Sequence, residues 1–380
     1  MSVVEFSFPT TIRFGTGAAR EVAPRLIEAG LTRPLIVTDP GVSALAIHAR
    51  LAESLQSAGL TVATFDGIRS NPVIDNVSAG VASFRDHQAD CVVGLGGGAA
   101  LDVAKAIALM ATHPGELLDY EDEVPGARPI DHTVAPLFAL PTTAGTGSEV
   151  GRSAVISDEH HIKRIIYSPH LLPRVVFADP LLTADLPAHL TAATGLDALT
   201  HNVEAYLSPH FHPMCDGIAI EGVRLCAANL ESAVADGTDM DARSAMLMAS
   251  MMGAVAFQKG LGLVHSCAHA LGTAVDLHHG LANGLMIDHA LRFNIDSAGD
   301  KMTHLATVIG LPDPNPEHFL SWLGTLKASV GVSANLAEHG LDAGLAGELV
   351  GLALADPCHA NNPAPVTEAD FVEVFDRAFS

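Results

Sequence analysis

The side chains of this 380-residue chain that are best suited to chemistry are histidines and an aspartate in its second half. One group pairs an aspartate with a histidine four residues on, another pairs two histidines four apart, and two adjacent histidines follow. Residues four apart share one face of a helix. The six candidates are Asp197, His201, His265, His269, His278 and His279.

One carboxylate and several imidazoles form a donor set that suits Fe²⁺ or Zn²⁺ and leaves a position open for substrate. The spacing does not decide which four of the six candidates bind. Pairing His265 with His269 is the simplest choice, because these two residues lie one helical turn apart.

A glycine-rich turn in the first half predicts a phosphate site. Residues 91–95 form an apolar run that continues directly into Gly96, Gly97 and Gly98, and a helical pattern follows over 99–110. Such glycines let backbone amides approach a phosphate, which also meets the positive end of the helix dipole. The order GLGGGAALDVAK differs from GxGxxG, so a tight turn that binds nothing is an equal alternative.

Two further features favour a nucleotide at this turn. Asp39 ends a strand predicted at 35–38, where a carboxylate can accept hydrogen bonds from ribose hydroxyls, although before Pro40 it could also serve only the turn. Residues 141–149, PTTAGTGSE, follow a strand predicted at 138–140 and are rich in hydroxyl groups and glycine. Together these loops predict a nucleotide site.

The elements that must hold these loops alternate up to about residue 187. Short, mostly apolar runs at 35–38, 62–65, 91–95 and 175–178 are typical of buried parallel strands. Helical patterns lie between them, for example at 43–58 and 77–87. This alternation predicts an α/β domain over 1–187, with an open parallel sheet covered by helices on both faces.

From residue 188 the pattern changes to long stretches rich in Ala, Leu and Met, with a period of 3.6 residues. Predicted helices cover 190–207, 213–235, 241–257, 263–276, 281–294, 317–330 and 368–378. These stretches predict an all-helical domain over 188–380, which carries the candidate metal ligands.

The amino-acid composition, above all the net charge, limits the classes of partner that the protein can bind. The chain has 20 Lys and Arg against 43 Asp and Glu, a net charge of −23. Such a surface repels phosphate backbones and anionic lipid, so we expect neither a nucleic-acid partner nor a membrane partner. A hydrophobic content of 48% provides ample material for a core and excludes a disordered chain.

Localisation is predicted from the cysteines and the N-terminus. The five cysteines are scattered and form no CxxC motif, which is typical of a reduced protein without a disulfide framework. The first residues show no signal-peptide pattern, and no apolar run is long enough to span a bilayer. We therefore expect a cytoplasmic protein.

Together, the motifs resemble those of the iron-containing (group III) alcohol dehydrogenases, including the lactaldehyde:propanediol oxidoreductase and 1,3-propanediol dehydrogenase branch. The strongest segments are GLGGGAALDVAKAIA, LPTTAGTGSEV, TGLDALTHNVEAY and GLGLVHSCAHALGTAVDLHHGLANGLM. The resemblance implies a Rossmann-like α/β N-terminal domain plus an all-α C-terminal domain, the dehydroquinate synthase-like fold. It also implies a homodimer or a higher homo-oligomer.

The resemblance assigns roles to single residues. It places the metal, Fe²⁺ with Zn²⁺ as the alternative, on Asp197, His201, His265 and His279, and thereby replaces the simpler pairing. The family's further histidine falls on His269, near the substrate and nicotinamide, as the catalytic residue.

The resemblance likewise maps the cofactor site onto this chain. The implied cofactor-binding residues are Asp39, Gly96, Gly97, Gly98, Asp102, Lys105, Thr142, Thr143 and Thr146. The family's usual serine after the three glycines is Ala99 here, so one hydroxyl contact to phosphate is lost while the backbone amides remain.

The implied function is a metal-dependent, NAD-linked alcohol dehydrogenase that interconverts a small primary alcohol and its aldehyde. NAD is favoured over NADP because the Asp39 carboxylate would repel a 2′-phosphate. The alternatives are a metal-independent enzyme like maleylacetate reductase, a metallohydrolase, and a non-catalytic nucleotide-binding module. Lys259 and Arg152 are further candidates, as cations that could attract an anionic group on the substrate.

Overall fold

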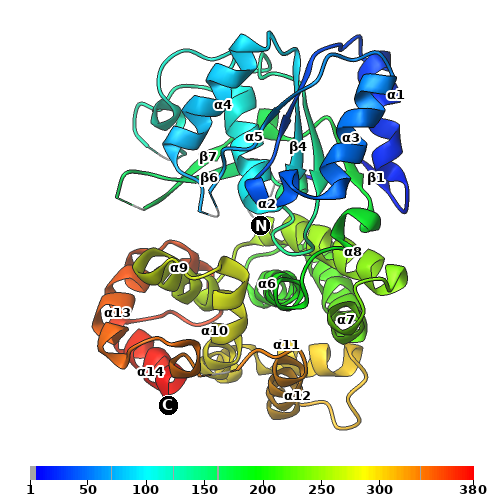
Figure 1. The fold of residues 1–380 in the computed structure, drawn as a ribbon. Helices are drawn as coiled ribbons and strands as arrows, with labels where there is room; N and C mark the ends of the chain where they lie inside the picture. The colour runs from blue at the N-terminus through cyan, green and yellow to red at the C-terminus, as the bar shows by residue number, and fades with distance from the viewer. Residues whose placement is uncertain (1–5, 70, 123, 161, 334) are drawn as a thin grey trace. The chain divides into compact units, whose positions relative to one another are not determined.

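The computed structural model describes residues 6–69, 71–122, 124–160, 162–333 and 335–380, and the chain divides into two compact units (Figure 1). The first, which we call the α/β unit, consists of residues 8–143 and 147–184. The second, the helical unit, contains residues 6–7, 144–146 and 185–380.

A six-stranded parallel sheet forms the centre of the α/β unit, with the strand order β1-β8-β5-β4-β2-β3. Its strands are β1 (Thr11–Phe14), β2 (Pro34–Val37), β3 (Ala63–Phe65), β4 (Cys91–Gly96), β5 (Leu137–Pro141) and β8 (Val175–Ala178). Five of these six match predicted strands to within one or two residues. A separate antiparallel pair, β6 (Ser153–Ser157) and β7 (Lys163–Tyr167), was not predicted.

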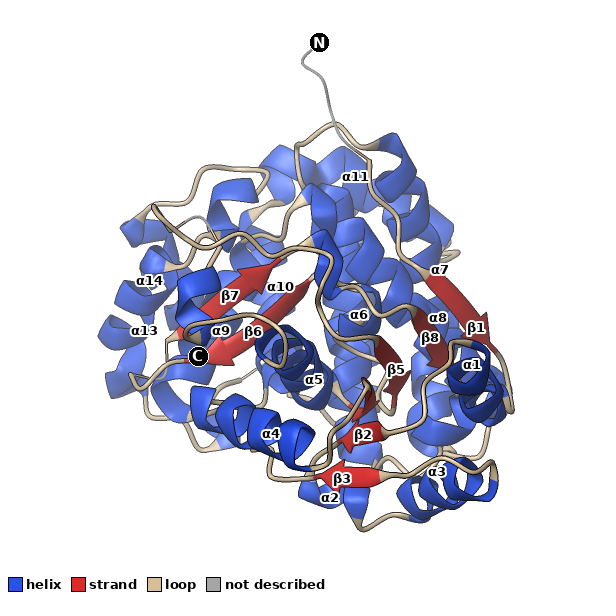
Figure 2. Ribbon diagram, turned by 90° about the horizontal axis from the view of Figure 1, so that it is seen from above, coloured by secondary structure: helices blue, strands red, loops and turns tan. Residues whose placement is uncertain are grey.

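Helices cover both faces of this sheet, as the alternating pattern predicts (Figure 2). They are α1 (Val22–Glu28), α2 (Pro40–Ser43), α3 (Ala46–Ser57), α4 (Ile74–Asp86) and α5 (Gly98–Met110). Short 3₁₀ turns are η1 (Ala18–Glu21), η2 (Leu117–Tyr120), η3 (Ser148–Val150), η4 (Pro169–Leu171) and η5 (Pro180–Thr183).

Successive strand residues face opposite sides and build two cores. In β2, Leu35 and Val37 pack into the core that contains α4 and α5, whereas Ile36 packs into the core that contains α1 and α3. All four residues of β2 are buried, so its sequence shows a continuous apolar run, the signal from which the strand was predicted.

The chain direction across the sheet reverses between β2 and β4. The chain moves outward from β2 to β3 and then returns to place β4 on the other side of β2. In open parallel sheets, ligands bind beyond the carboxyl ends of the strands at such a switch point. Asp39 follows β2 and Gly97 follows β4, so the fold brings these two predicted residues to that position.

The helical unit contains α-helices and short 3₁₀ turns. The helices are α6 (Ala188–Leu207), α7 (Pro213–Ala235), α8 (Met240–Ala256), α9 (Leu263–Val275), α10 (His279–Phe293), α11 (Ile295–Val308), α12 (Pro316–Ser329), α13 (Ala346–Ala355) and α14 (Glu368–Phe379). The 3₁₀ turns are η6 (Phe257–Lys259), η7 (Ala337–His339), η8 (Ala343–Leu345) and η9 (Cys358–Asn361). Seven helices were predicted; α11 and α13 were not.

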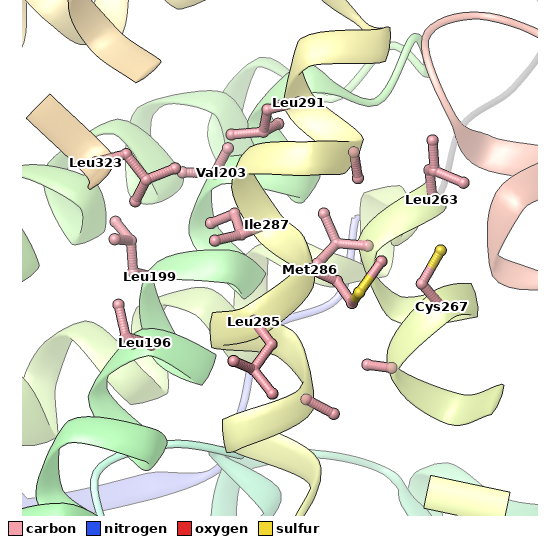
Figure 3. Close-up of a cluster of buried hydrophobic side chains, with 14 of the residues drawn as sticks. Leu196, Leu199, Val203, Leu263, Cys267, Leu285, Met286, Ile287, Leu291 and Leu323 are labelled. Carbon is pink, nitrogen blue, oxygen red and sulfur yellow. The ribbon is translucent and has the colours of Figure 1, made fainter. Parts of the chain in front are cut away.

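Helix α6 runs through the core of the helical unit, and seventeen consecutive residues, from Thr191 to Leu207, are buried. Its apolar side chains pack with those of α10 and α12, as Leu199, Ile287 and Leu323 show in Figure 3. Gly280 permits the close approach of α10, because a Cβ atom there would lie 2.6 Å from the carbonyl oxygen of Ala193. The packing therefore requires glycine immediately after His279.

Among the described residues, no single helix is both long enough and apolar enough to cross a membrane. Only the segments Met240–Lys259 and Leu263–Val275, which meet at a bend of 106°, pass that test as a pair, by length and composition. All five cysteines are free thiols.

Candidate active site

Four predicted ligands converge in the helical unit. Helix α6 provides Asp197 and His201, α9 provides His265, and α10 begins with His279. One donor atom from each residue lies within 4.8 Å of the donor atoms of the other three. The Asp197 Oδ1 atom is 3.8 Å from His201 Nε2 and 3.6 Å from His279 Nε2.

Burial suits these groups to hold a cation. Asp197, His201 and His265 are at most 4% exposed. Burial lowers the pKa of His201 to about 4, with Asp197 opposing that shift, so its imidazole is neutral at physiological pH. A neutral imidazole has the free lone pair that a metal needs. One carboxylate with three imidazoles is a donor set that fits Fe²⁺ or Zn²⁺.

Glu204, which the sequence reading missed, fixes His265 in place. Its Oε2 atom is 2.5 Å from His265 Nδ1, and its Oε1 atom accepts a hydrogen bond of 2.7 Å from the Val264 backbone N–H. Because a carboxylate accepts, Nδ1 carries the proton, and Nε2 is left as the bare nitrogen that faces the other ligands. Gly262 is the N-cap residue of α9 and has no side chain to accept from the first backbone N–H groups, so Glu204 caps this helix instead.

His269 lies beside the four ligands. Its ring stacks on that of His279, with centroids 5.3 Å apart and planes 20° apart, and meets His265 edge-on. Its Nδ1 atom is 2.7 Å from Asp356 Oδ2, while Asp356 Oδ1 accepts from Ser266 Oγ and from the Cys358 backbone N–H. Burial opposes ionisation of Asp356, but these hydrogen bonds outweigh it and lower its pKa.

Two further candidates lie outside this arrangement. His278 caps α10, where its Nδ1 accepts from the Leu281 backbone N–H at 3.4 Å, and it is not part of the four-ligand cluster. The idea that Lys259 attracts an anionic substrate is wrong. Lys259 is 3% exposed, and its ammonium already bonds Asp216 and the Tyr206 carbonyl.

The predicted cofactor loops lie largely in the α/β unit. Helix α5 starts after Gly97, which offers no capping side chain, and its first turn holds no acidic residue. No side chain of the cap or first turn therefore compensates the positive end of this helix, which favours an anion there. A Cβ atom on Gly96 would lie 2.6 Å from Ala100 Cβ and 3.5 Å from Asp39 Oδ2. Only glycine leaves this space beside the carboxylate.

The two oxygens of Asp39 have different surroundings. Oδ1 accepts a hydrogen bond of 3.0 Å from the Val42 backbone N–H, so the residue does serve the turn, whereas Oδ2 lies on the side of Gly96. Thr142 donates its backbone N–H to the Gly96 carbonyl, and Thr143 lies against Gly97. Thr146 belongs to the helical unit.

Asp102 and Lys105 bond to the protein rather than face an open site. Lys105 is 1% exposed, and its ammonium donates to Ser148 Oγ at 2.8 Å and to the Ser153 carbonyl at 2.6 Å. Asp102 accepts from Ser148 Oγ and from the Val155 backbone N–H. These contacts tie α5 to η3 and β6, so both side chains support the threonine–glycine loop.

Glu149 is buried in the same region. Its side chain is 1% exposed, and its Oε1 atom has no hydrogen-bond partner among the described residues. Burial raises the pKa of Glu149 to about 7, and nearby Lys105 only partly offsets this effect. The carboxyl group therefore holds a proton up to near-neutral pH.

Comparisons with known proteins show the family to which this chain belongs. Residues 9–180 match the family model of the iron-containing alcohol dehydrogenases, and residues 191–379 match the model of the C-terminal region of the Fe-containing alcohol dehydrogenase family. These matches cover most of the chain, which therefore belongs to the iron-containing alcohol dehydrogenase family and is an oxidoreductase.

Particular relatives resemble the chain over its whole length. The 4-hydroxybutyrate dehydrogenase of Cupriavidus necator is 40% identical over 378 residues, covering 97% of this chain and 98% of that protein. A crystal structure of 1,3-propanediol oxidoreductase matches with a TM-score of 0.94 and 35% identity, covering 100% of both chains. The sulfoacetaldehyde reductase from Bifidobacterium kashiwanohense, in complex with NAD⁺, matches with a TM-score of 0.91 and 29% identity, also covering 100% of both.

Replacing Glu204 tests its hold on His265. In Glu204→Gln the amide oxygen can still cap α9, but the amide N–H₂ faces His265 Nδ1 and favours the wrong tautomer. We expect Zn²⁺ to bind about 10- to 100-fold more weakly, measured by calorimetric titration. Glu231→Gln, an exposed change on α7, should bind Zn²⁺ normally. Equal affinity in Glu204→Gln and the unsubstituted protein would contradict this role.

Glu149→Gln tests the buried carboxyl group. From pH 4.5 to about 7, the folded protein keeps a proton that the unfolded chain has released, so rising pH destabilises the fold through this group. The loss reaches up to about 3 kcal/mol and is complete above pH 7. Thermal unfolding should show Glu149→Gln gaining stability over the unsubstituted protein as pH rises. A constant difference, like that expected for exposed Glu53→Gln, would refute this assignment.

Proposed function

We propose that this protein is a metal-dependent, NAD-linked alcohol dehydrogenase that interconverts a small primary alcohol and its aldehyde. The observation that carries the proposal is the cluster of Asp197, His201, His265 and His279, whose donor atoms lie within 4.8 Å of one another. These residues would hold Fe²⁺ or Zn²⁺. A metal ion there supplies a Lewis acid that polarises the oxygen of the alcohol or aldehyde.

The surrounding residues prepare the site for this chemistry. Glu204 keeps the proton of His265 on Nδ1, away from the metal position. Asp356 orients His269 in the same way, through Nδ1. We propose that His269 Nε2 accepts the proton that the alcohol loses and passes it to solvent, to which the side chain is 24% exposed.

The α/β unit would hold the cofactor. The backbone amides at Gly97 and Gly98 and the first turn of α5 would bind the pyrophosphate. Asp39 Oδ2 would accept hydrogen bonds from the ribose hydroxyls and would repel a 2′-phosphate. We propose that Asp102 and Lys105 act indirectly, because both hold Ser148 in the adjoining loop. The NAD⁺ complex of the sulfoacetaldehyde reductase supports this choice of cofactor.

The relatives suggest which substrates to test first. One relative is named for 4-hydroxybutyrate and another for 1,3-propanediol, so the panel pairs ω-hydroxy acids with neutral diols. A homodimer or larger homo-oligomer stays a prediction from the family resemblance, and a cytoplasmic location stays a prediction from the cysteines and the N-terminus.

The activity itself is tested with anaerobically purified protein, stripped by a chelator and reloaded with Fe²⁺ or Zn²⁺. We expect an alcohol-dependent rise in the absorbance of reduced nicotinamide with NAD⁺, lost on stripping and restored on reloading. His265→Ala should abolish metal binding and turnover, whereas His318→Ala, an exposed histidine of the same unit, should retain both. Full activity in the stripped protein would favour a metal-independent reductase, and cofactor binding without turnover would favour a binding module.

Asp39→Asn tests the choice of cofactor. The amide can still cap α2 but no longer repels a 2′-phosphate, so we expect the ratio of kcat/KM for NAD to that for NADP to fall about tenfold or more. Asp86→Ala, an exposed acidic residue at the end of α4, is the matched control and should leave this ratio unchanged. An unchanged ratio in Asp39→Asn would remove Asp39 from the cofactor site.

A further inference from the structure

A buried amide lies against the ligand cluster. Asn283 is on α10, four residues after His279, and is fully buried. Its Nδ2 atom lies 2.7 Å from Asp197 Oδ1 and 3.2 Å from both His265 Nε2 and His279 Nε2. One nitrogen thus contacts the donor atoms of three of the four ligands, which come from three different helices.

The orientation of this amide is set by the ligands. His265 Nε2 is bare, because its Nδ1 proton points to Glu204, so it can only accept from Asn283. The other end of the amide, Oδ1, is buried without a hydrogen-bond partner among the described residues. A flipped amide would place Oδ1 against the Asp197 carboxylate, where two acceptors repel. The amide thus leaves Oδ1 unsatisfied while Nδ2 contacts the ligands.

Three donor atoms, Asp197 Oδ1, His265 Nε2 and His279 Nε2, define a triangle. The Asn283 Nδ2 atom lies within hydrogen-bond distance of all three corners. An atom placed this way covers that face of the donor set. We infer that Asn283 is a positioning residue that closes this face of the donor set, an inference that rests on the metal centre proposed above. The oxygen of the substrate must then enter through another face of the site.

The same contact has a role before a metal arrives. Asp197 is 1% exposed, and a buried carboxylate without a donor is costly. The two N–H hydrogens of Asn283 are shared between this carboxylate and the imidazole nitrogens 3.2 Å away, so the ligands are held together in the metal-free protein. When a cation takes the imidazole lone pairs, the carboxylate keeps further lone pairs for the amide, and Asn283 remains bonded to Asp197.

The experiment uses the full-length protein, titrated with Zn²⁺ by calorimetry and with Co²⁺ by visible absorption. In Asn283→Ala we expect Zn²⁺ to bind about 10- to 100-fold more weakly, as for other residues that orient metal ligands. The Co²⁺ bands should also weaken, because water entering the opened face raises the coordination number. Unchanged affinity together with an unchanged Co²⁺ spectrum would overturn the inference.

Asn283→Asp preserves the shape of the side chain and guards against a misfolded alanine variant. It replaces the donor with a second carboxylate beside Asp197, so the metal-free protein should be less stable and Zn²⁺ should bind more tightly. The inference therefore predicts opposite changes in affinity for the two substitutions. A role in packing alone predicts the same direction for both, and that outcome would also overturn it.

Asn202→Ala is the matched control. Asn202 is equally buried, its Oδ1 also lacks a partner among the described residues, and its Nδ2 donates to the Ala198 and Ala249 carbonyls instead of the ligands. This variant should lower the melting temperature but leave the Zn²⁺ affinity and the Co²⁺ spectrum unchanged. If the unsubstituted protein binds neither ion, the metal centre and this inference both fail; if it binds and Asn283→Ala is normal, only the inference fails.

Discussion

The helical unit depends on how it buries one negative charge. Asp197 lies in the middle of α6, 1% exposed, where an isolated carboxylate would be strongly destabilising. It is tolerated because Asn283 donates to it and two imidazoles face it. A bound cation would complete this compensation. The site and the core of the unit are therefore one structure, since the helices that pack the core also bring these groups together.

Two carboxylates beside the site orient histidines in the same way. Glu204 accepts from His265 Nδ1, and Asp356 accepts from His269 Nδ1, each across the space between two elements. Each carboxylate also accepts a hydrogen bond from a backbone N–H group, Glu204 from Val264 and Asp356 from Cys358. These bonds hold the carboxylates in the positions from which they orient the imidazoles. The result is a pair of histidines whose tautomers are decided by packing, which is what metal binding and proton transfer require.

The cofactor site proposed for the α/β unit would have to accept an anionic ligand in a protein with a net charge of −23. In this proposal, backbone dipoles rather than exposed cations attract that ligand. The start of α5 has neither a capping side chain nor an acidic residue, and Lys105 is turned inward to hold Ser148. Overall charge thus says little about this site, because local amides and one helix end determine its electrostatics.

The sequence by itself determined five of the six strands of the parallel sheet and seven helices of the helical unit. Burial on both faces gives strands continuous apolar runs, and burial on one face gives helices a period of 3.6 residues. The sequence did not reveal β1, an exposed edge strand, or α11, which contains Gly299 and a kink at Ala298. Spacing also grouped Asp197 with His201, but which of the six candidates meet was decided by tertiary structure. The partners of His265, His269 and Asp197 lie 61, 87 and 86 residues away, and only packing brings them into contact. For the same reason, Lys259 looked available in the sequence but is paired with Asp216 in the fold.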